Sequence, residues 1–138
     1  MKKIFVLFFL MSISLGYSQT ELITNGNFAG GTASWTGNNF SVVSGEAYIS
    51  STTSAGNLWD TQLVQGGMSF TSGTQYTLTF KARAASNRNI TVAIQNVGEW
   101  SDQFRQTYAL TTTMQTFTST FTAPSSNGNV QIGFLMAA

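Results

Sequence analysis

The chain has 138 residues, of which 8% are charged, and it contains neither cysteine nor histidine. It can therefore form no disulfide, no thiolate nucleophile, no Ser-His-Asp triad and no metal site that uses histidine. Apart from Lys2 and Lys3, four basic residues stand against five acidic ones, so the chain lacks the concentrated cationic face that nucleic acid requires.

Residues 1–18 have the pattern of a secretory signal peptide. Two lysines follow Met1, an apolar run begins at residue 4, and the triplet 16–18 begins and ends with small residues. The run of roughly 12 residues is shorter than the ~20 that a transmembrane helix needs. We therefore expect a secreted or cell-surface protein whose mature chain, residues 19–138, is a single domain with no membrane span.

Short segments in which apolar and polar residues alternate occur throughout the mature chain, separated by Gly, Asn and Ser clusters. No segment has helical periodicity. Alternation with a period of two indicates strands with one face on a core and the other in water. Several such strands predict an all-β sandwich or barrel. The segments expected as strands are 40–42, 47–49, 76–82, 90–94, 117–121 and 130–134.

The same alternation predicts which polar side chains point outward. In the segment 76–83 it places Lys81 and Arg83 on the face opposite the apolar residues, and in the next segment it places Gln95 there. We expect these two strands to be neighbours that present one polar platform, which Gln62 joins.

Six motifs follow one another in order along the mature chain. They are LITNGNF at 22–28, Trp35, WDTQL at 59–63, GTQYTLTFKARA at 73–84, RNI at 88–90 and MQTF at 114–117. Together they resemble the carbohydrate-binding modules of families 4, 9 and 22. The resemblance implies a jelly-roll β-sandwich, galactose-binding-domain-like, that binds β-glucans, xylans or mixed-linkage chains and is commonly attached to secreted glycoside hydrolases. It also implies that Trp35 is a core or loop-anchoring residue.

Two features depart from the family pattern. Asn27 and Ala29 stand where acidic side chains often help to hold a structural calcium, which needs several oxygen ligands. We therefore expect no cofactor, with a structural calcium as the alternative. The chain also stops at Ala138 within a strand pattern, where family members have one more strand. Because this would leave an unpaired sheet edge, we expect a fragment of a longer protein with fused domains, and a natural stop is the alternative.

Sugar rings offer apolar C–H faces and a rim of hydroxyl groups, so a binding site needs flat aromatic surfaces and directional hydrogen-bonding groups. The segment 98–108, expected as a loop, supplies Trp100 and Tyr108 as stacking candidates, with burial in the core as the alternative for each. Trp59 is a third aromatic candidate if it lies at a groove rim, although its parity with Leu63 favours burial. The polar candidates are Gln62, Arg83, Gln95 and Lys81. The three basic residues Lys81, Arg83 and Arg88 would instead favour a uronic-acid polymer as the ligand.

Catalysis by this segment is not expected. Glycosidic cleavage uses two carboxyl groups about 5 to 10 Å apart, and the nearest pair in the sequence, Glu99 and Asp102, is interpreted as solvated loop acids. We expect a non-catalytic module that binds polysaccharide and tethers an attached enzyme to it. The alternatives are an adhesion or protein-contact sandwich, and the accessory part of a glycoside hydrolase whose catalytic residues lie elsewhere.

Overall fold

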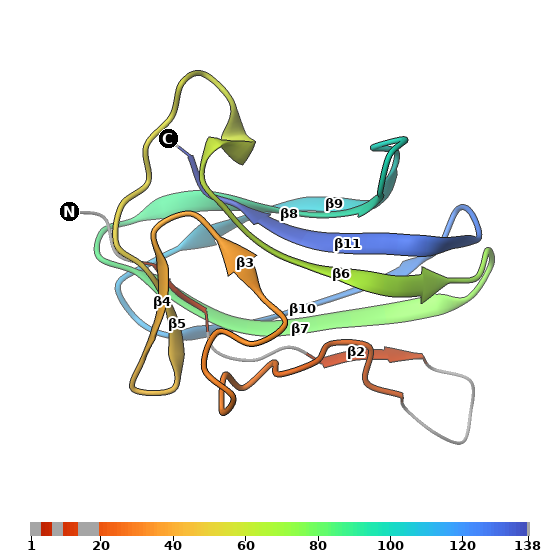
Figure 1. Ribbon diagram of the computed structural model, residues 1–138, viewed down its shortest axis with the longest axis horizontal. Coiled ribbons are helices and arrows are strands. Elements are labelled where there is room, and N and C mark those ends of the chain that lie inside the picture. Colours follow the sequence, from red (N-terminus) through yellow and green to blue (C-terminus); the bar gives the residue numbers. More distant parts are fainter. Residues whose placement is uncertain (1–3, 7–9, 14–19, 138) are drawn as a thin grey trace.

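Eleven β-strands and one 3₁₀ turn, η1 (Leu58–Asp60), make up the part of the chain that the computed structural model describes, residues 4–6, 10–13 and 20–137. The strands form two antiparallel sheets that face each other (Figure 1), so the all-β sandwich is confirmed. No helix long and apolar enough to cross a membrane occurs among the described residues. All six predicted strand segments are strands.

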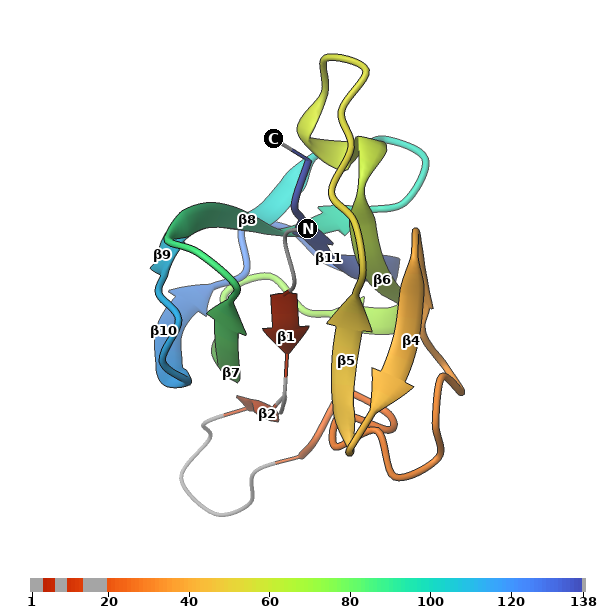
Figure 2. The same ribbon diagram turned by 90° about the vertical axis from the view of Figure 1, so that its left-hand side faces the viewer.

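The two sheets share no strand. The five-stranded sheet has the order β3 (Thr36–Gly37), β6 (Gln62–Phe70), β11 (Asn127–Leu135), β8 (Arg88–Asn96) and β9 (Asp102–Leu110). The six-stranded sheet has the order β10 (Gln115–Thr122), β7 (Gln75–Ala84), β1 (Ile4–Val6), β5 (Glu46–Ile49) and β4 (Phe40–Val43), with β2 (Leu10–Ile13) also paired to β7. Figure 2 shows β7, β1, β5 and β4 side by side in this second sheet.

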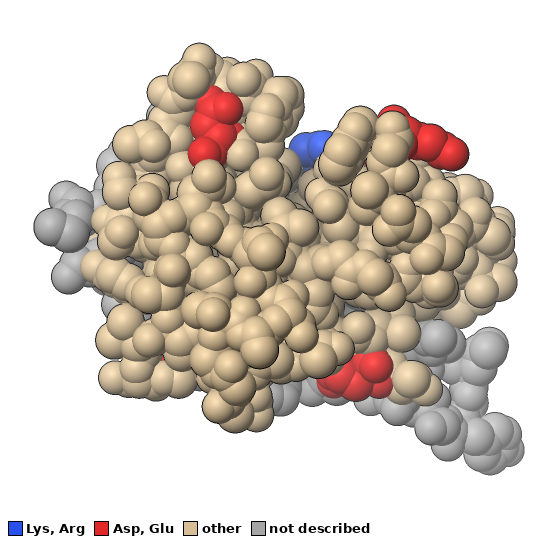
Figure 3. All heavy atoms as spheres, in the orientation of Figure 1, with Lys and Arg blue, Asp and Glu red and all other residues tan. Residues whose placement is uncertain are grey.

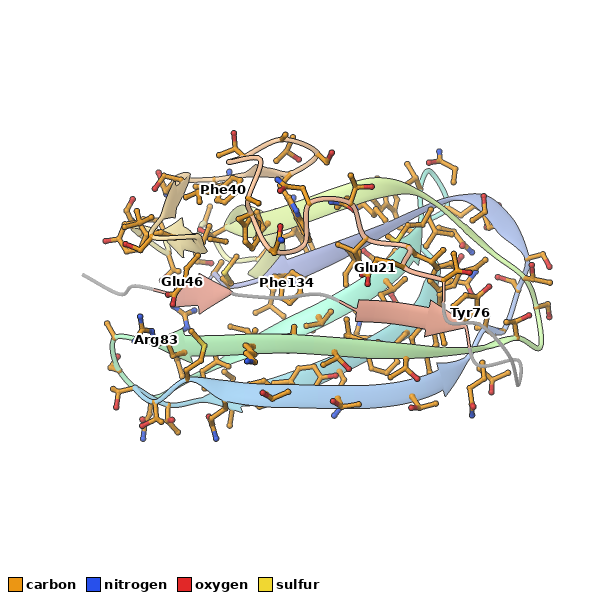
Figure 4. All side chains as sticks on the ribbon, turned by 90° about the horizontal axis from the view of Figure 1, so that it is seen from below. Glu21, Phe40, Glu46, Tyr76, Arg83 and Phe134 are labelled. Carbon is orange, nitrogen blue, oxygen red and sulfur yellow. The ribbon has the colours of Figure 1, made fainter. Side chains whose placement is uncertain are left out.

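Aromatic and aliphatic side chains fill the space between the sheets. Along β7 every second residue is buried, and Phe80 is central. Its ring centroid lies 5.3 Å from that of Phe134 and 5.1 Å from that of Tyr108, so it joins the two sheets by edge-to-face contacts. Figure 4 shows Phe134 between the sheets, and Tyr76 toward the other end of the core.

The expectation that consecutive polar strands form one platform is wrong. β7 and β8 belong to opposite sheets, because residues 85–87 carry the chain from one sheet to the other. Lys81 and Arg83 therefore belong to the six-stranded sheet, whereas Gln95 belongs to the five-stranded one. Alternation shows that each strand has a buried face, but not which strand lies beside it.

The segment expected as a loop at 98–108 is mostly strand. Only residues 97–101 turn between β8 and β9, and β9 begins at Asp102. The register of the pair shifts beside Ile94, which lies opposite Phe104, whereas Gln95 lies opposite Asp102. This bulge interrupts the alternation of inward and outward side chains by which strands are recognised in a sequence.

The chain's last strand is not a sheet edge. β11 pairs with β6 on one side and with β8 on the other, so the expected unpaired edge does not occur at this strand. Backbone bonds from Met136 to Thr61 (2.8 Å) and from Ala137 to Leu58 (3.2 Å) continue this contact.

Within the predicted signal peptide, β1 and β2 pair with strands of the six-stranded sheet. The expected cleavage triplet, 16–18, lies outside the described residues.

Candidate functional site

A row of five residues crosses the outer face of the five-stranded sheet, one from each strand. Strand register places Thr36 opposite Val64, Val64 opposite Gly133, Gly133 opposite Ala93 and Ala93 opposite Arg105. Neighbouring strands lie about 4.8 Å apart, so the row is about 19 Å long. Its middle members have small side chains or none, and the row is therefore the floor of a trough that runs across the strands.

Longer side chains border this floor on both sides. Gln95 and Gln131 face each other in the adjacent row on one side, and Gln62 and Leu135 do so on the other. The resulting groove has a volume of about 640 Å³. It is lined by Thr36, Trp59, Gln62, Val64, Gln95, Trp100, Arg105, Gln131 and Leu135.

Two tryptophans form the walls. Trp59 belongs to η1, before the first residue of β6, and Trp100 belongs to the turn between β8 and β9. Their exposed fractions are 59% and 56%, which is unusual for large aromatic residues. Figure 1 shows these two segments rising above the same sheet, and Figure 3 shows the surface hollowed between them.

Hydrogen bonds to Asp60 hold the Trp59 segment in place. The Oδ2 atom of this carboxylate accepts from the backbone N–H of Ala55 (2.6 Å) and of Asn57 (2.9 Å). These backbone bonds lower the pKa of Asp60 below its ordinary value of 3.8, and the bond from Asn57 has the largest effect. The ionised carboxylate thus orders the loop that carries the indole.

Hydrogen bonds to the backbone of Trp100 hold this second wall in place. Trp100 donates its N–H to the carbonyl of Asn96 at 2.8 Å, and its own carbonyl accepts from Gln95 Nε2 at 3.3 Å. Its φ of +58° lies in the left-handed region, which bulky residues seldom occupy. The turn therefore imposes this conformation on Trp100.

Among the described residues, Arg105 is the one charged residue that lines the groove, and its charge is paired. Its Nε lies 2.8 Å from Asp102 Oδ2, and its Nη2 lies 3.2 Å from Asp102 Oδ1. The hydrogen bond from Arg105 is the main cause of the lowered pKa of Asp102, and Gln95 adds a bond of 2.9 Å. The groove is therefore close to neutral, and its other polar groups are mainly amides.

Four of the seven predicted site residues come together in this groove, namely Trp59, Gln62, Gln95 and Trp100. The other three lie elsewhere. Tyr108 is 6% exposed and points into the core, where its hydroxyl lies 2.7 Å from Ser119 Oγ. Lys81 and Arg83 belong to the opposite sheet, and Figure 4 shows Arg83 beside Glu46, with which it forms an ion pair of 3.1 Å.

The sequence interpretation missed other groove residues, including Arg105, Gln131 and the floor residue Gly133. Alternation along 130–134 puts Gln131 and Gly133 on the face away from the buried Ile132 and Phe134, so the sequence could have shown that both point outward. The sequence could not show the strand order, which places β11 between the strands of Gln62 and Gln95.

The opening loop is held by its own amide groups. Asn25 Nδ2 donates to the carbonyls of Gly31 (2.9 Å) and Ala33 (2.8 Å), and Asn27 Oδ1 accepts from the N–H of Ala29 (3.1 Å). The Asn25 amide therefore occupies, by hydrogen bonding, the carbonyl oxygens of Gly31 and Ala33 that could otherwise coordinate a cation. The described residues also contain no cluster of three or more His, Cys, Asp or Glu side chains that could hold a metal. This loop does not fit calcium.

Trp35 anchors the same loop, as predicted. It is buried, and its indole Nε1 donates to the carbonyl of Asn25 at 3.1 Å.

Comparison with known proteins gives a consistent result. The family model described as "Carbohydrate binding domain" matches residues 20–137. A solved structure described as "CBM4 structure and function" is 31% identical with a TM-score of 0.75, and the match covers 84% of this chain and 89% of that one. No curated protein matches the chain.

Two further solved structures share the fold. The N-terminal cellulose-binding domain of β-1,4-glucanase C from Cellulomonas fimi is 21% identical with a TM-score of 0.56, over 75% of this chain and 76% of that one. The structure described as BiXyn10A CBM1 in its apo form is 15% identical with a TM-score of 0.57, over 96% and 90%.

Proposed function

The chain belongs to the carbohydrate-binding modules of families 4 and 9, and we propose that it binds a neutral polysaccharide of the β-glucan or xylan type in the groove between Trp59 and Trp100. Modules of this family are non-catalytic, so the chain binds carbohydrate without cleaving it. In the proposed complex the polysaccharide lies across the strands, along the row from Thr36 to Arg105.

The observation that carries the proposal is the pair of exposed indoles above an amide-lined floor. Indole faces stack on the apolar faces of pyranose rings. Gln62 and Gln131 offer both donors and acceptors to hydroxyl groups, and Gln95, whose Nε2 donates to Trp100 and Asp102, offers its carbonyl oxygen. Each hydrogen bond contributes about 0.5 to 1.5 kcal/mol net, and each stack a similar amount. After the cost of association, we expect dissociation constants roughly in the micromolar to millimolar range.

Charge supports a neutral ligand over a uronic-acid polymer. Arg105 is neutralised by Asp102, and Lys81 and Arg83 lie on the opposite sheet. A polyanion would find no unpaired cation among the residues that line the groove.

The proposed biological role is to tether an attached enzyme to its substrate in a secreted or cell-surface protein. Tethering raises the local concentration of the enzyme without changing its chemistry. The signal-peptide pattern of residues 1–18 supports export, and its removal would take away β1 and β2 but no strand of the groove. N-terminal sequencing of the exported protein tests this, with Gln19 as the expected first residue.

Affinity electrophoresis tests the binding proposal, with gels that contain cellulose derivatives, mixed-linkage β-glucan, xylan or alginate. We expect retardation by at least one of the neutral polymers and none by alginate. Trp100→Ala should abolish the retardation, whereas Lys81→Ala, on the opposite sheet, should leave it unchanged. A folded wild-type protein that no polysaccharide retards would contradict the proposal.

A further inference from the structure

Trp100 has a conformation that its own side chain does not explain. The residue is 56% exposed, and its φ of +58° is unfavourable for a bulky residue. The contacts that fix it are backbone hydrogen bonds to Asn96: the N–H of Trp100 donates to the Asn96 carbonyl at 2.8 Å, and the N–H of Asn96 donates to the Ser101 carbonyl at 2.9 Å. The direction of the indole therefore depends on the position of Asn96.

The side chain of Asn96 is held as firmly as its backbone. It is 3% exposed, its Nδ2 lies 2.8 Å from Ser101 Oγ, and its Oδ1 lies 2.8 Å from Gln103 Nε2. Asn96, the last residue of β8, is thus bonded to the turn through Ser101 and to β9 through Gln103. A buried amide with these partners has little freedom to rotate.

Gln103 completes the arrangement from the bulge in β9. It lies between the register pairs Ile94–Phe104 and Gln95–Asp102, and it is 5% exposed. Its Nε2 also lies 2.9 Å from Ser125 Oγ and 3.0 Å from the Ser125 carbonyl. Bulges of this kind often redirect a side chain next to a functional site.

Ser125 connects the turn to the rest of the sandwich. It belongs to the loop between β10 and β11, and its neighbour Ser126 accepts through Oγ from the N–H of Ser72 at 2.8 Å. Nearby, the N–H of Gly73 donates to the Ala123 carbonyl at 2.9 Å. The Trp100 turn is therefore fastened, through Gln103 and Ser125, to a loop that connects the two sheets, and this loop is bonded to a second such connection, between β6 and β7.

We infer that the buried Asn96 and Gln103 and the half-buried Ser125 form a clamp that fixes Trp100 in its binding orientation before any ligand arrives. None of the three lines the groove, so they are positioning residues that control affinity through Trp100. This inference rests on the proposed function for its effect on binding. Its effect on the orientation of Trp100 is independent of any ligand.

The test removes the clamp without changing the groove. Gln103→Met keeps the length of the side chain but loses its amide, and Gln115→Met, on the exposed edge strand β10, is the matched control. Affinity is measured with Trp59 in place; for fluorescence alone, both variants also contain Trp59→Phe, so that Trp100 is the exposed tryptophan and Trp35 the buried one. Time-resolved fluorescence anisotropy and acrylamide quenching then report the mobility of Trp100 in the absence of sugar.

We expect Gln103→Met to increase the fast anisotropy decay and the quenching, and Gln115→Met to leave both unchanged. If the binding-competent orientation falls to about a tenth of the population, apparent affinity falls about tenfold. If Gln103→Met does not fold, Ser125→Ala replaces it, with Ser125→Thr as the variant that restores the hydroxyl.

The results separate the two proposals. A wild-type protein that binds no polysaccharide would overturn the proposed function, whereas the fluorescence comparison would still decide whether the clamp exists. Unchanged Trp100 mobility in folded Gln103→Met would overturn the clamp, whatever the wild type binds. Increased mobility with unchanged affinity would overturn its control of binding.

Discussion

Gly133 lies beside Val64 on the groove floor, at a distance that would place an added Cβ atom 3.8 Å from Val64 Cγ2. The same Cβ would lie 3.4 Å from Leu135 Cδ2 and 3.8 Å from Gln62 Oε1, which are ordinary contact distances. A side chain thus fits at this position, and the part of it beyond Cβ would rise into the groove.

Gly133→Val is therefore expected to fold and to lose binding. The valine methyl groups would occupy the space above the floor, and β-branched residues favour strands. Isothermal titration with the best polysaccharide fragment should show at least about a tenfold loss of affinity, since about 1.4 kcal/mol of lost contact is enough. Gly128→Val, near Ser69 at the far end of the same strand, is the control and should bind normally. Full affinity in Gly133→Val would place the ligand elsewhere.

Freeing the charge of Arg105 should change the ligand preference. In Asp102→Ala the guanidinium loses its partner, so alginate should begin to retard the protein, and added salt should weaken this effect. Stability should change by only about 0.2 to 1 kcal/mol, because the pair is largely exposed. The control is Glu46→Gln, which disrupts the Arg83 pair on the opposite sheet and should not induce alginate binding. Alginate binding in both variants would mean that charge outside the groove is responsible.

Acid should loosen the Trp59 wall. The folded state lowers the pKa of Asp60, so the carboxylate stabilises its loop fully above the ordinary value of 3.8, and the contribution is lost as pH falls through the lower folded value. Acrylamide quenching of Trp59, measured with Trp100→Phe, should be constant from about pH 8 to pH 5 and rise below about pH 4. Asp60→Asn should show higher quenching at neutral pH, with a smaller change in acid. A transition near pH 6 would contradict this account.

Tyr108 should affect stability and not binding. Tyr108→Phe removes the hydroxyl that lies 2.7 Å from Ser119 Oγ, and urea unfolding should show a loss of about 1 kcal/mol. Burial raises the pKa of this phenol above 10.0, so the folded state is favoured fully below pH 10 and loses that contribution as pH rises through the folded value. The variant should therefore lose less stability than the wild type in strong alkali. Weaker sugar binding by this variant would instead show that the Tyr108 hydroxyl takes part in the site.

The sequence predicted the strands of the core well, because period-two alternation reports directly on burial. For Trp59 it left two alternatives, burial by parity with Leu63 and exposure at a groove rim. Trp59 is exposed, because parity applies only within a strand and Trp59 lies in η1 before β6 begins. The groove floor depends on which distant strands pair, as Gly133 does with Val64 and Ala93. Local patterns contain no information about such pairings, and the same limit applied to β7 and β8.

The central place of β11 also determines when the groove can form during synthesis. Strands β6 and β8 leave the ribosome long before residues 127–135, yet they do not pair with each other, because β11 lies between them. Until β11 inserts, both have an unpaired edge, which exposes the nascent chain to aggregation. The binding surface is thus assembled after translation of nearly the whole domain, and a ribosome stalled before residue 127 would present a chain without a groove.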